Sequence, residues 1–377
     1  MGRPVTKGRA VSTGKEVAGT GKSSRPPLVP GGGSATDHAS AAARRRSSPT
    51  VEFVLRWGTG LLAVVPFAAV IAMLVVLLDE AMPSIRYNGW HFLSSSVWTN
   101  GDTYGTISHA GGVAHLLGAE FGAWPLIAGT LESSAIAIVI GLPIAIGAAV
   151  MVVEKLPATI GTVIGICLEI LAGIPSVVIG IWGALTFGPW IAREIYPTLT
   201  HLPNIPPFDI FRGSVGDGEG LLTSGLVLAA MIIPIIAATT RDLLRQVPET
   251  TKEGAEALGM TDAEVFRRVQ ARWVRTGVIG AAILGLGRAL GETIAVALIC
   301  GGQSVVASNI YGVFNTIAAT IVTSLDSAQT DPSGLAVRAL AELALVLLLI
   351  SLVANIFARV IIRRSAKGAV LPVGAGF

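Results

Sequence analysis

Six stretches of this chain are long and apolar enough to cross a lipid bilayer, and they limit the fold more than any other feature. A helix needs about 20 residues to cross a hydrocarbon core of about 30 Å. The stretches lie at approximately 54–78, 124–153, 159–190, 221–240, 274–300 and 335–362. Only 14% of the 377 residues are charged, whereas soluble domains carry about 25%. We therefore predict an all-α membrane protein with six transmembrane helices.

The Lys and Arg residues are distributed unevenly between the predicted loops. If the N-terminus is cytoplasmic, 22 of them lie on the cytoplasmic side and 3 outside, and the other two lie in membrane segments. Such a bias sets the orientation, with the basic loops inside. We predict cytoplasmic N- and C-termini, an external loop at 79–123 and a cytoplasmic loop at 241–273.

The first 50 residues differ in composition from the rest of the chain. They carry nine Lys or Arg residues against two acids, are rich in Gly, Ser and Pro, and lack apolar periodicity. Such a segment cannot bury enough apolar area to offset chain entropy, so we predict a disordered basic tail at 1–50. Its Gly-Thr-Gly-Lys-Ser run lacks the first glycine of a phosphate-binding loop, because Glu16 stands there, so it is no ATP site. The basic charge is that of the tail and does not predict nucleic-acid binding.

Catalytic and metal-binding groups are scarce in the predicted membrane segments. Cys167 and Cys300 are the two cysteines, and they give neither a disulfide framework nor a thiolate metal site. The five histidines lie in the tail or in hydrophilic loops. An intramembrane enzyme would need a nucleophile–base set or metal ligands at membrane depth. We therefore predict no enzymatic activity, no cofactor and no metal site in this chain.

Arg288 and Glu292 interrupt a stretch that is otherwise free of charge from Thr276 to Leu325. An ionised side chain in hydrocarbon costs about 2.5–3.5 kcal/mol on insertion scales, so it is usually kept for a function. The i, i+4 spacing predicts that both side chains share one helix face. At 1.5 Å per residue, Arg288 lies about 20 Å and Glu169 about 15 Å into their helices, near the midplane. We predict that Arg288, Glu292 and Glu169 line a pathway for a polar or anionic solute.

The same charges are also compatible with a structural role. Arg288 and Glu292 could neutralise one another as a buried pair that fixes helix packing. For Glu169, the pathway and the structural interpretation remain equally open. Arg338 and Glu342 have the same spacing near the outer end of the last helix, where we interpret them as an interfacial pair.

Two of the predicted helices contain small residues or proline at positions that affect helix packing. Gly287 and Gly291 form a small-xxx-small step, which is typical of close helix packing. Gly173 and Pro175 follow Glu169 in the helix predicted at 159–190. We assign them to helix packing as well, and we expect them to loosen this helix and free backbone groups that line a cavity.

The predicted cytoplasmic loop at 241–273 contains the pattern of two short helices joined by a turn. Pro248 followed by Glu249 is a helix start, and Gly259 can end that helix in a left-handed conformation. Thr261 with Glu264 forms a capping box that begins the second helix. We predict that this hairpin lies along the membrane surface.

This hairpin resembles the coupling loop of binding-protein-dependent ABC importer permeases. Glu253, Ala255 and Gly259 match the family motif, while Gly254 replaces an alanine and Ala271-Arg272 stand where Leu-Pro is usual. The resemblance implies that the loop docks on a cytoplasmic ATPase subunit. It also implies that the coupling residues are Glu253, Ala255, Glu256 and Gly259. The alternative is an amphipathic hairpin that merely links two spans.

Two runs in the membrane segments are similar to PstC-type permeases of bacterial phosphate importers. They are Leu168-Glu-Ile-Leu-Ala-Gly-Ile-Pro-Ser176 and Leu284-Gly-Leu-Gly-Arg-Ala-Leu-Gly-Glu-Thr293. The resemblance covers roughly 124–359 and implies a type I ABC importer permease fold. The implied organisation is a tail at 1–50, a first helix at 51–78, an external loop at 79–123, a permease core at 124–362 and a cytoplasmic tail at 363–377.

The resemblance also implies the partners of the chain. They are phosphate, a PstA-like second permease, two cytoplasmic ATPase subunits and an external phosphate-binding protein, assembled in the lipid of a bacterial plasma (inner) membrane. Another oxyanion, such as sulfate or molybdate, is the alternative substrate. A carboxylate such as Glu292 can accept a hydrogen bond from a phosphate P–OH group, which sulfate lacks. The charges at 288 and 292 therefore favour phosphate.

Overall fold

The computed structural model describes residues 49–102, 105–110, 112–201 and 208–367. Almost all of the tail predicted at 1–50, and the part of the predicted C-terminal tail beyond Lys367, lie outside the described residues. The chain divides into two units, residues 1–67 and 68–377. The described part of the first unit is the beginning of helix α2 (Pro49–Asn88), and the following account concerns the second unit.

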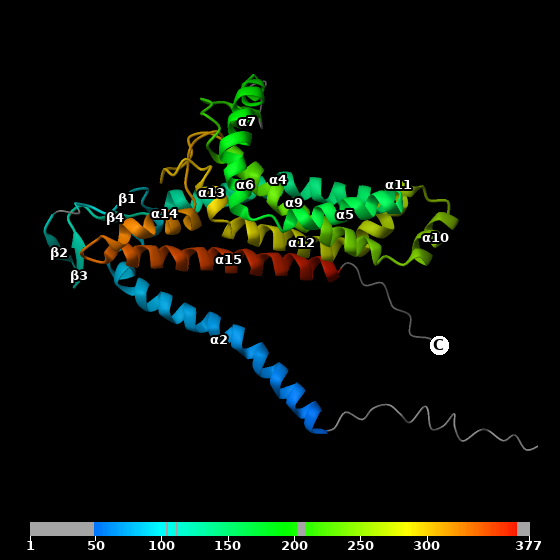
Figure 1. Ribbon diagram of the computed structural model, residues 1–377, viewed down its shortest axis with the longest axis horizontal. Coiled ribbons are helices and arrows are strands. Elements are labelled where there is room, and N and C mark those ends of the chain that lie inside the picture. The colour runs from blue at the N-terminus through cyan, green and yellow to red at the C-terminus, as the bar shows by residue number, and fades with distance from the viewer. Residues whose placement is uncertain (1–48, 103–104, 111, 202–207, 368–377) are drawn as a thin grey trace, which may run out of the picture. The chain divides into compact units, whose positions relative to one another are not determined.

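Among the described residues, five helices are long and apolar enough to cross a membrane (Figure 1). They are Trp57–Asn88 in α2, Trp124–Lys155, Leu221–Arg245, Asp262–Gly291 and Leu335–Ile362. The second combines α4 (Trp124–Val150) with a π-helical turn (Met151–Lys155), the third is α9, and the last belongs to α15 (Leu335–Lys367). A sixth span exists if two helices bent by 92° count as one. The prediction of a membrane protein built mainly of helices is confirmed.

The helix predicted at 159–190 is not continuous. Helix α5 (Ala158–Ala172) ends before Gly173, and a new helical run begins at Ser176 and turns away by 92°. Proline lacks a backbone N–H and disfavours a helical residue before it, so Pro175 stops α5 from continuing. The loosening expected at Gly173 and Pro175 is thus a full break, and both residues are exposed rather than packed between helices.

The second half of the broken span is a series of short helical pieces. They are α6 (Ser176–Trp182), a π-helical turn (Gly183–Phe187) and α7 (Gly188–Glu194), followed by α8 (Tyr196–Thr200) and a 3₁₀ turn (Phe208–Phe211). Helix α6 packs against α13 (Ile294–Ala297). A Cβ added at Gly180 would lie 2.8 Å from the Cα of Ala295, so this contact needs glycine.

Helices α4, α9 and α12 (Ala271–Gly291) pack closely, and the glycines at their contacts are not those predicted from the sequence. A Cβ at Gly285 would lie 2.6 Å from Cδ1 of Ile236, and small residues allow such an approach between membrane helices. No atom lies within 4 Å of a Cβ built at Gly287 or Gly291. At about 100° per residue, these two lie roughly opposite Gly285. The packing expected of them is therefore not made within the described chain.

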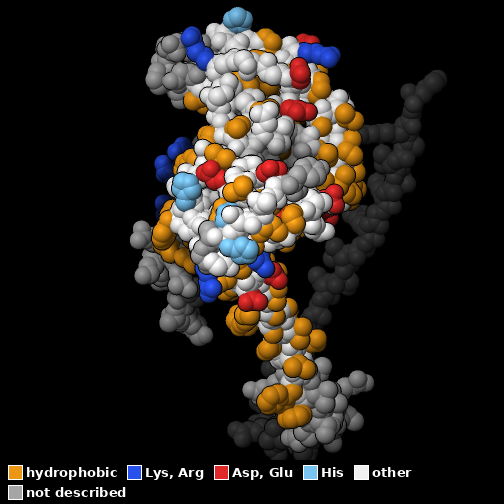
Figure 2. Space-filling model, turned by 90° about the vertical axis from the view of Figure 1, so that its left-hand side faces the viewer, with side chains coloured by type: hydrophobic (Ala, Val, Ile, Leu, Met, Phe, Trp, Pro, Cys, Tyr) orange, Lys and Arg blue, Asp and Glu red, His pale blue; other side chains and the backbone are white. Residues whose placement is uncertain are grey.

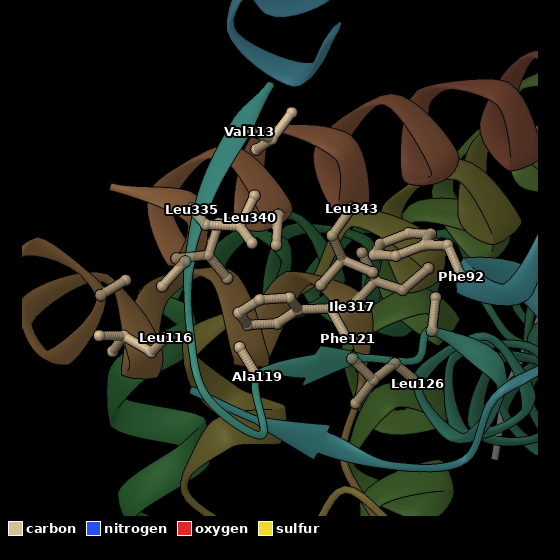
Figure 3. Packing of buried hydrophobic residues seen from close by; sticks show 14 residues of the cluster. Phe92, Val113, Leu116, Ala119, Phe121, Leu126, Ile317, Leu335, Leu340 and Leu343 are labelled. Carbon is tan, nitrogen blue, oxygen red and sulfur yellow. The ribbon is translucent and has the colours of Figure 1, made fainter. Parts of the chain in front are cut away.

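The described residues between 89 and 123, within the predicted external loop, form a small folded cap. Its elements are α3 (His91–Ser94) and two antiparallel strand pairs. Strand β1 (Trp98–Thr99) pairs with β4 (Glu120–Phe121), and β2 (Ile107–Ala110) pairs with β3 (Val113–Leu116). In Figure 3, side chains of the cap pack against α14 (Ile317–Gln329) and the start of α15. This cluster includes Phe92, Leu116, Phe121, Ile317, Leu335 and Leu343.

Glu342 of α15 is buried against the end of α2. Its carboxylate accepts hydrogen bonds from Ser84 Oγ at 2.7 Å and Asn88 Nδ2 at 3.4 Å. Neither Arg338 nor any other cation of the described residues pairs with it. The interpretation of Arg338 and Glu342 as an ion pair is therefore wrong. The prediction failed because α2 is longer than expected. This helix continues ten residues past the predicted end, and the extension brings Ser84 and Asn88 to the Glu342 carboxylate.

Helix α2 presents apolar side chains to its surroundings. Hydrophobic side chains, among them Val70, Met73 and Val76, are exposed along the helix (Figure 2). Such a surface is stable where the surrounding medium is the hydrocarbon of a bilayer.

Candidate functional site

Arg288 lies in the last turn of α12 and is half-buried. Its Nε atom is buried and has no hydrogen-bond partner. Among the described residues, no carboxylate forms an ion pair with its guanidinium. The buried pair with Glu292, which was one interpretation of the sequence, is therefore not formed.

A hollow of about 680 Å³ opens beside Arg288. Three helices form its wall, with Ile235 from α9, Asn355 from α15 and Gly280, Leu284 and Gly287 from α12. No atom lies within 4 Å of a Cβ built at Gly280 or Gly287, so glycine leaves this face of α12 open. The hollow therefore combines a mostly apolar wall with the guanidinium of Arg288, which forms no ion pair with the described residues.

Glu292 lies beyond the end of α12, because the helix predicted at 274–300 stops at Gly291. Its backbone is extended, with φ −71° and ψ 128°. The Thr293 hydroxyl donates a hydrogen bond to the Gly291 carbonyl at 3.2 Å, and such local bonds compete with continuation of a helix. Arg288 and Glu292 therefore do not share one helix face. Glu292 is half-buried, and no described residue donates a hydrogen bond to its carboxylate.

Glu169 pairs with Arg241 rather than with Arg288. The Arg241 Nη2 atom lies 2.8 Å from Glu169 Oε1 and 2.9 Å from Asp242 Oδ1. The Arg241 side chain is only 7% exposed, while that of Glu169 is 59% exposed. A Cβ at Gly165 would collide with this guanidinium. The pair joins α5, the first half of the broken span, to α9.

The local signals predicted between the fourth and fifth spans are confirmed, but the second helix of the predicted hairpin is the beginning of the fifth span, Asp262–Gly291, and not a separate helix. Helix α9 runs to Arg245, so the hairpin begins later than 241. Helix α10 (Glu249–Ala257) follows, Gly259 has a left-handed φ of 82°, and α11 (Asp262–Val265) begins with the Thr261–Glu264 capping box. A π-helical turn (Phe266–Gln270) leads directly into α12. We call residues 249–270 the coupling segment, after the family's coupling loop that their sequence resembles.

The coupling segment and the cap lie at opposite ends of the helix bundle in Figure 1. Glu253 and Glu256 are exposed on α10, and Ala255 is buried beneath it. Leu258, which is not among the coupling residues predicted from the sequence, is 80% exposed beside Gly259.

The ion pair of Arg241 was not predicted either, because the sequence pattern assigns Arg241 to the start of the cytoplasmic loop. One signal was present in the sequence. Gly165 and Glu169 are four residues apart, so a small residue and an acid share a helix face. Such a step can accept a long cationic side chain from a neighbouring helix.

Residues 141–367 match the family described as "Binding-protein-dependent transport system inner membrane component". The match covers more than half of the chain, and the chain belongs to this family. With five candidate spans among the described residues, and a sixth if the bent helix pair counts as one span, it is a multi-pass inner-membrane protein.

Two relatives are similar over most of their length. The chain is 52% identical over 324 residues to "Phosphate transport system permease protein PstC 1" of Mycobacterium tuberculosis, covering 85% of this chain and 96% of the relative. It is 36% identical over 315 residues to "Phosphate transport system permease protein PstC" of Haemophilus influenzae, covering 83% and 94%. Among solved structures, a chain of a bacterial alginate ABC transporter has a TM-score of 0.47 and 17% identity, covering 82% of this chain and 97% of that one.

Proposed function

We propose that this chain is the permease subunit of an ATP-driven importer of inorganic phosphate. The 52% identity to a phosphate transport system permease, over 96% of that protein, carries the proposal. The chain forms the pathway with a second, PstA-like permease, while an external phosphate-binding protein delivers the substrate. Two cytoplasmic ATPase subunits hydrolyse the ATP.

Arg288 is the cation that phosphate passes in this proposal. A guanidinium presents a planar fork of N–H donors that suits oxyanions. Because no carboxylate of the described chain neutralises Arg288, its charge is available to a solute in the adjoining hollow. Glu292 lies four residues further on and accepts a hydrogen bond from a phosphate P–OH group. The two residues thus act on the solute rather than on each other.

Glu169 serves the pathway indirectly. Its carboxylate holds the buried guanidinium of Arg241 at 2.8 Å, and a buried charge needs such a partner. The pair fixes α5 to α9 just before the break at Gly173. The pair therefore anchors the first half of the broken span to α9 immediately before the bend.

The coupling segment transmits the work of the ATPase subunits to the pathway. Leu258, Glu253 and Glu256 are exposed and supply the docking surface, while Gly259 provides the turn between α10 and α11. The segment continues without interruption into α12, whose last turn carries Arg288. A movement of the docked segment therefore reaches Arg288 along a single helix.

An uptake experiment tests the substrate. The chain is produced with its second permease, ATPase and phosphate-binding protein in cells that lack high-affinity phosphate uptake, and labelled phosphate, sulfate and molybdate are supplied separately. We expect uptake of phosphate alone, and its loss when the ATPase is omitted. Absence of phosphate uptake with all four components present would contradict the proposed substrate.

The Leu258→Asp substitution tests the docking surface. Burying an exposed leucine at an interface contributes about 1.5–3 kcal/mol, and a carboxylate there would also have to be desolvated. We expect at least about tenfold less ATPase to co-purify with the variant. Leu117→Asp changes an exposed leucine of the cap and serves as the control. Equal recovery of the ATPase with both variants would contradict the assignment.

A further inference from the structure

Three ion pairs surround the place where the coupling segment meets the end of α4. Lys252 Nζ of α10 lies 3.6 Å from Glu154 Oε1 and 3.3 Å from Glu249 Oε2. Lys155 Nζ lies 3.6 Å from Asp262 Oδ2, at the start of α11. Glu154 and Lys155 belong to the π-helical turn that ends α4. Two of the three pairs therefore join α4 to the coupling segment, across about one hundred residues of sequence.

Burial separates the two connections. The side chains of Lys252 and Glu154 are only 15% and 23% exposed, whereas those of Lys155 and Asp262 are 63% and 86% exposed. Exposed pairs are screened by water and salt and contribute little, while partly buried pairs are screened much less. The Lys252–Glu154 pair therefore contributes more to holding α4 and the coupling segment together than the Lys155–Asp262 pair does.

The space around this pair is not filled by packing. A cavity of about 400 Å³ lies between the end of α4 and the coupling segment. Glu154 Oε1 and Gln270 Oε1, which both belong to residues lining it, are buried and accept no hydrogen bond, because the 3.6 Å between Glu154 Oε1 and Lys252 Nζ is an ion-pair distance and too long for a hydrogen bond. Beside the cavity, Ala149 packs with Val247 and Val274 in a small apolar cluster. The ion pair therefore bridges a gap where van der Waals contact is incomplete.

We propose that Lys252 is a positioning residue that links α10 to α4 through Glu154. The inference rests on the proposed function, because it requires an ATPase that moves the coupling segment. The backbone already joins this segment to α9 and α12. The Lys252–Glu154 pair adds α4, which packs along α9, so that the three helices move together. Without the pair, ATP is hydrolysed while part of the movement is lost before it reaches the pathway.

The test measures phosphate imported per ATP hydrolysed, with the complete importer in proteoliposomes. Lys252→Met keeps most of the side-chain length but removes the charge, and we expect it to lower this ratio about fivefold. Lys252→Arg keeps the charge, and we expect it to retain the ratio. Arg245→Met is the matched control, because Arg245 is exposed in the last turn of α9 and forms no ion pair with the described residues.

A double-mutant cycle separates coupling from a general structural effect. We expect Glu154→Gln to lower the ratio about as much as Lys252→Met, and the double variant to be no worse than either single one. An unchanged ratio in Lys252→Met, or single effects that multiply in the double variant, would overturn the inference. If the wild-type chain fails to recover the ATPase, the proposed function itself is contradicted.

Discussion

Replacing Arg288 with glutamine is expected to reduce phosphate uptake by about 10- to 100-fold. A hydrogen bond to a charged group contributes about 1.5–3 kcal/mol, and each 1.4 kcal/mol corresponds to a factor of about ten. Glutamine remains polar but loses the charge and the donor fork. Because Arg288 has no ion-pair partner among the described residues, its replacement leaves no carboxylate of the described chain unpaired. The effect should therefore fall on transport and not on assembly.

The measurement is initial uptake into proteoliposomes at equal amounts of assembled importer. Arg338→Gln is the control, because Arg338 is also half-buried in a span and forms no ion pair with the described residues. We expect this control to import phosphate at the wild-type rate. If Arg288→Gln did so as well, Arg288 would be part of the scaffold and the proposed pathway would lie elsewhere.

The coupling segment could be predicted from sequence because its signals are local. Proline before a helix, glycine in a left-handed turn and a capping box each act within a few residues. The structure shows α10 beginning at Glu249, Gly259 with a φ of 82° and the Thr261–Glu264 box. No distant contact is needed to specify these features.

The partners of the charged residues in the membrane segments could not be predicted in the same way, because they depend on which helices become neighbours. Arg241 reaches Glu169 only because α9 continues past residue 240 and Gly165 leaves room for the guanidinium. Glu342 meets Ser84 because α2 is longer than a bilayer requires. Hydropathy indicates that a segment spans the membrane but gives neither its end nor its partners.

Arg288 and Glu292 do not share a helix face as their i, i+4 spacing predicts, and the reason is related. An apolar run gives no sign of where a helix stops inside it, and 274–300 contains no proline. The stop at Gly291 became visible only in the structure, where α13 leaves α12 and packs on α6. This change places Glu292 outside the helix and frees its carboxylate from Arg288, which the proposed selectivity requires.

Replacing Glu292 with glutamine is expected to weaken the discrimination between phosphate and sulfate. An ionised carboxylate only accepts hydrogen bonds, so it can pair with a P–OH group but repels an anion without a proton. A glutamine amide offers N–H donors to either anion. Sites that read a substrate hydroxyl by a hydrogen bond reject analogues strongly, so we expect the preference for phosphate to fall at least about tenfold.

The preference is measured as competition of sulfate with labelled phosphate for the purified permease–ATPase complex. The external binding protein is left out, because its own selectivity would hide that of the permease. Glu132→Gln, at a half-buried carboxylate of α4, is the control and should leave the preference unchanged. Glu292→Gln should let sulfate displace phosphate while Arg288 still binds both anions. Equal discrimination by wild type and Glu292→Gln would remove Glu292 from the selectivity mechanism and leave Arg288 as an unselective anion site.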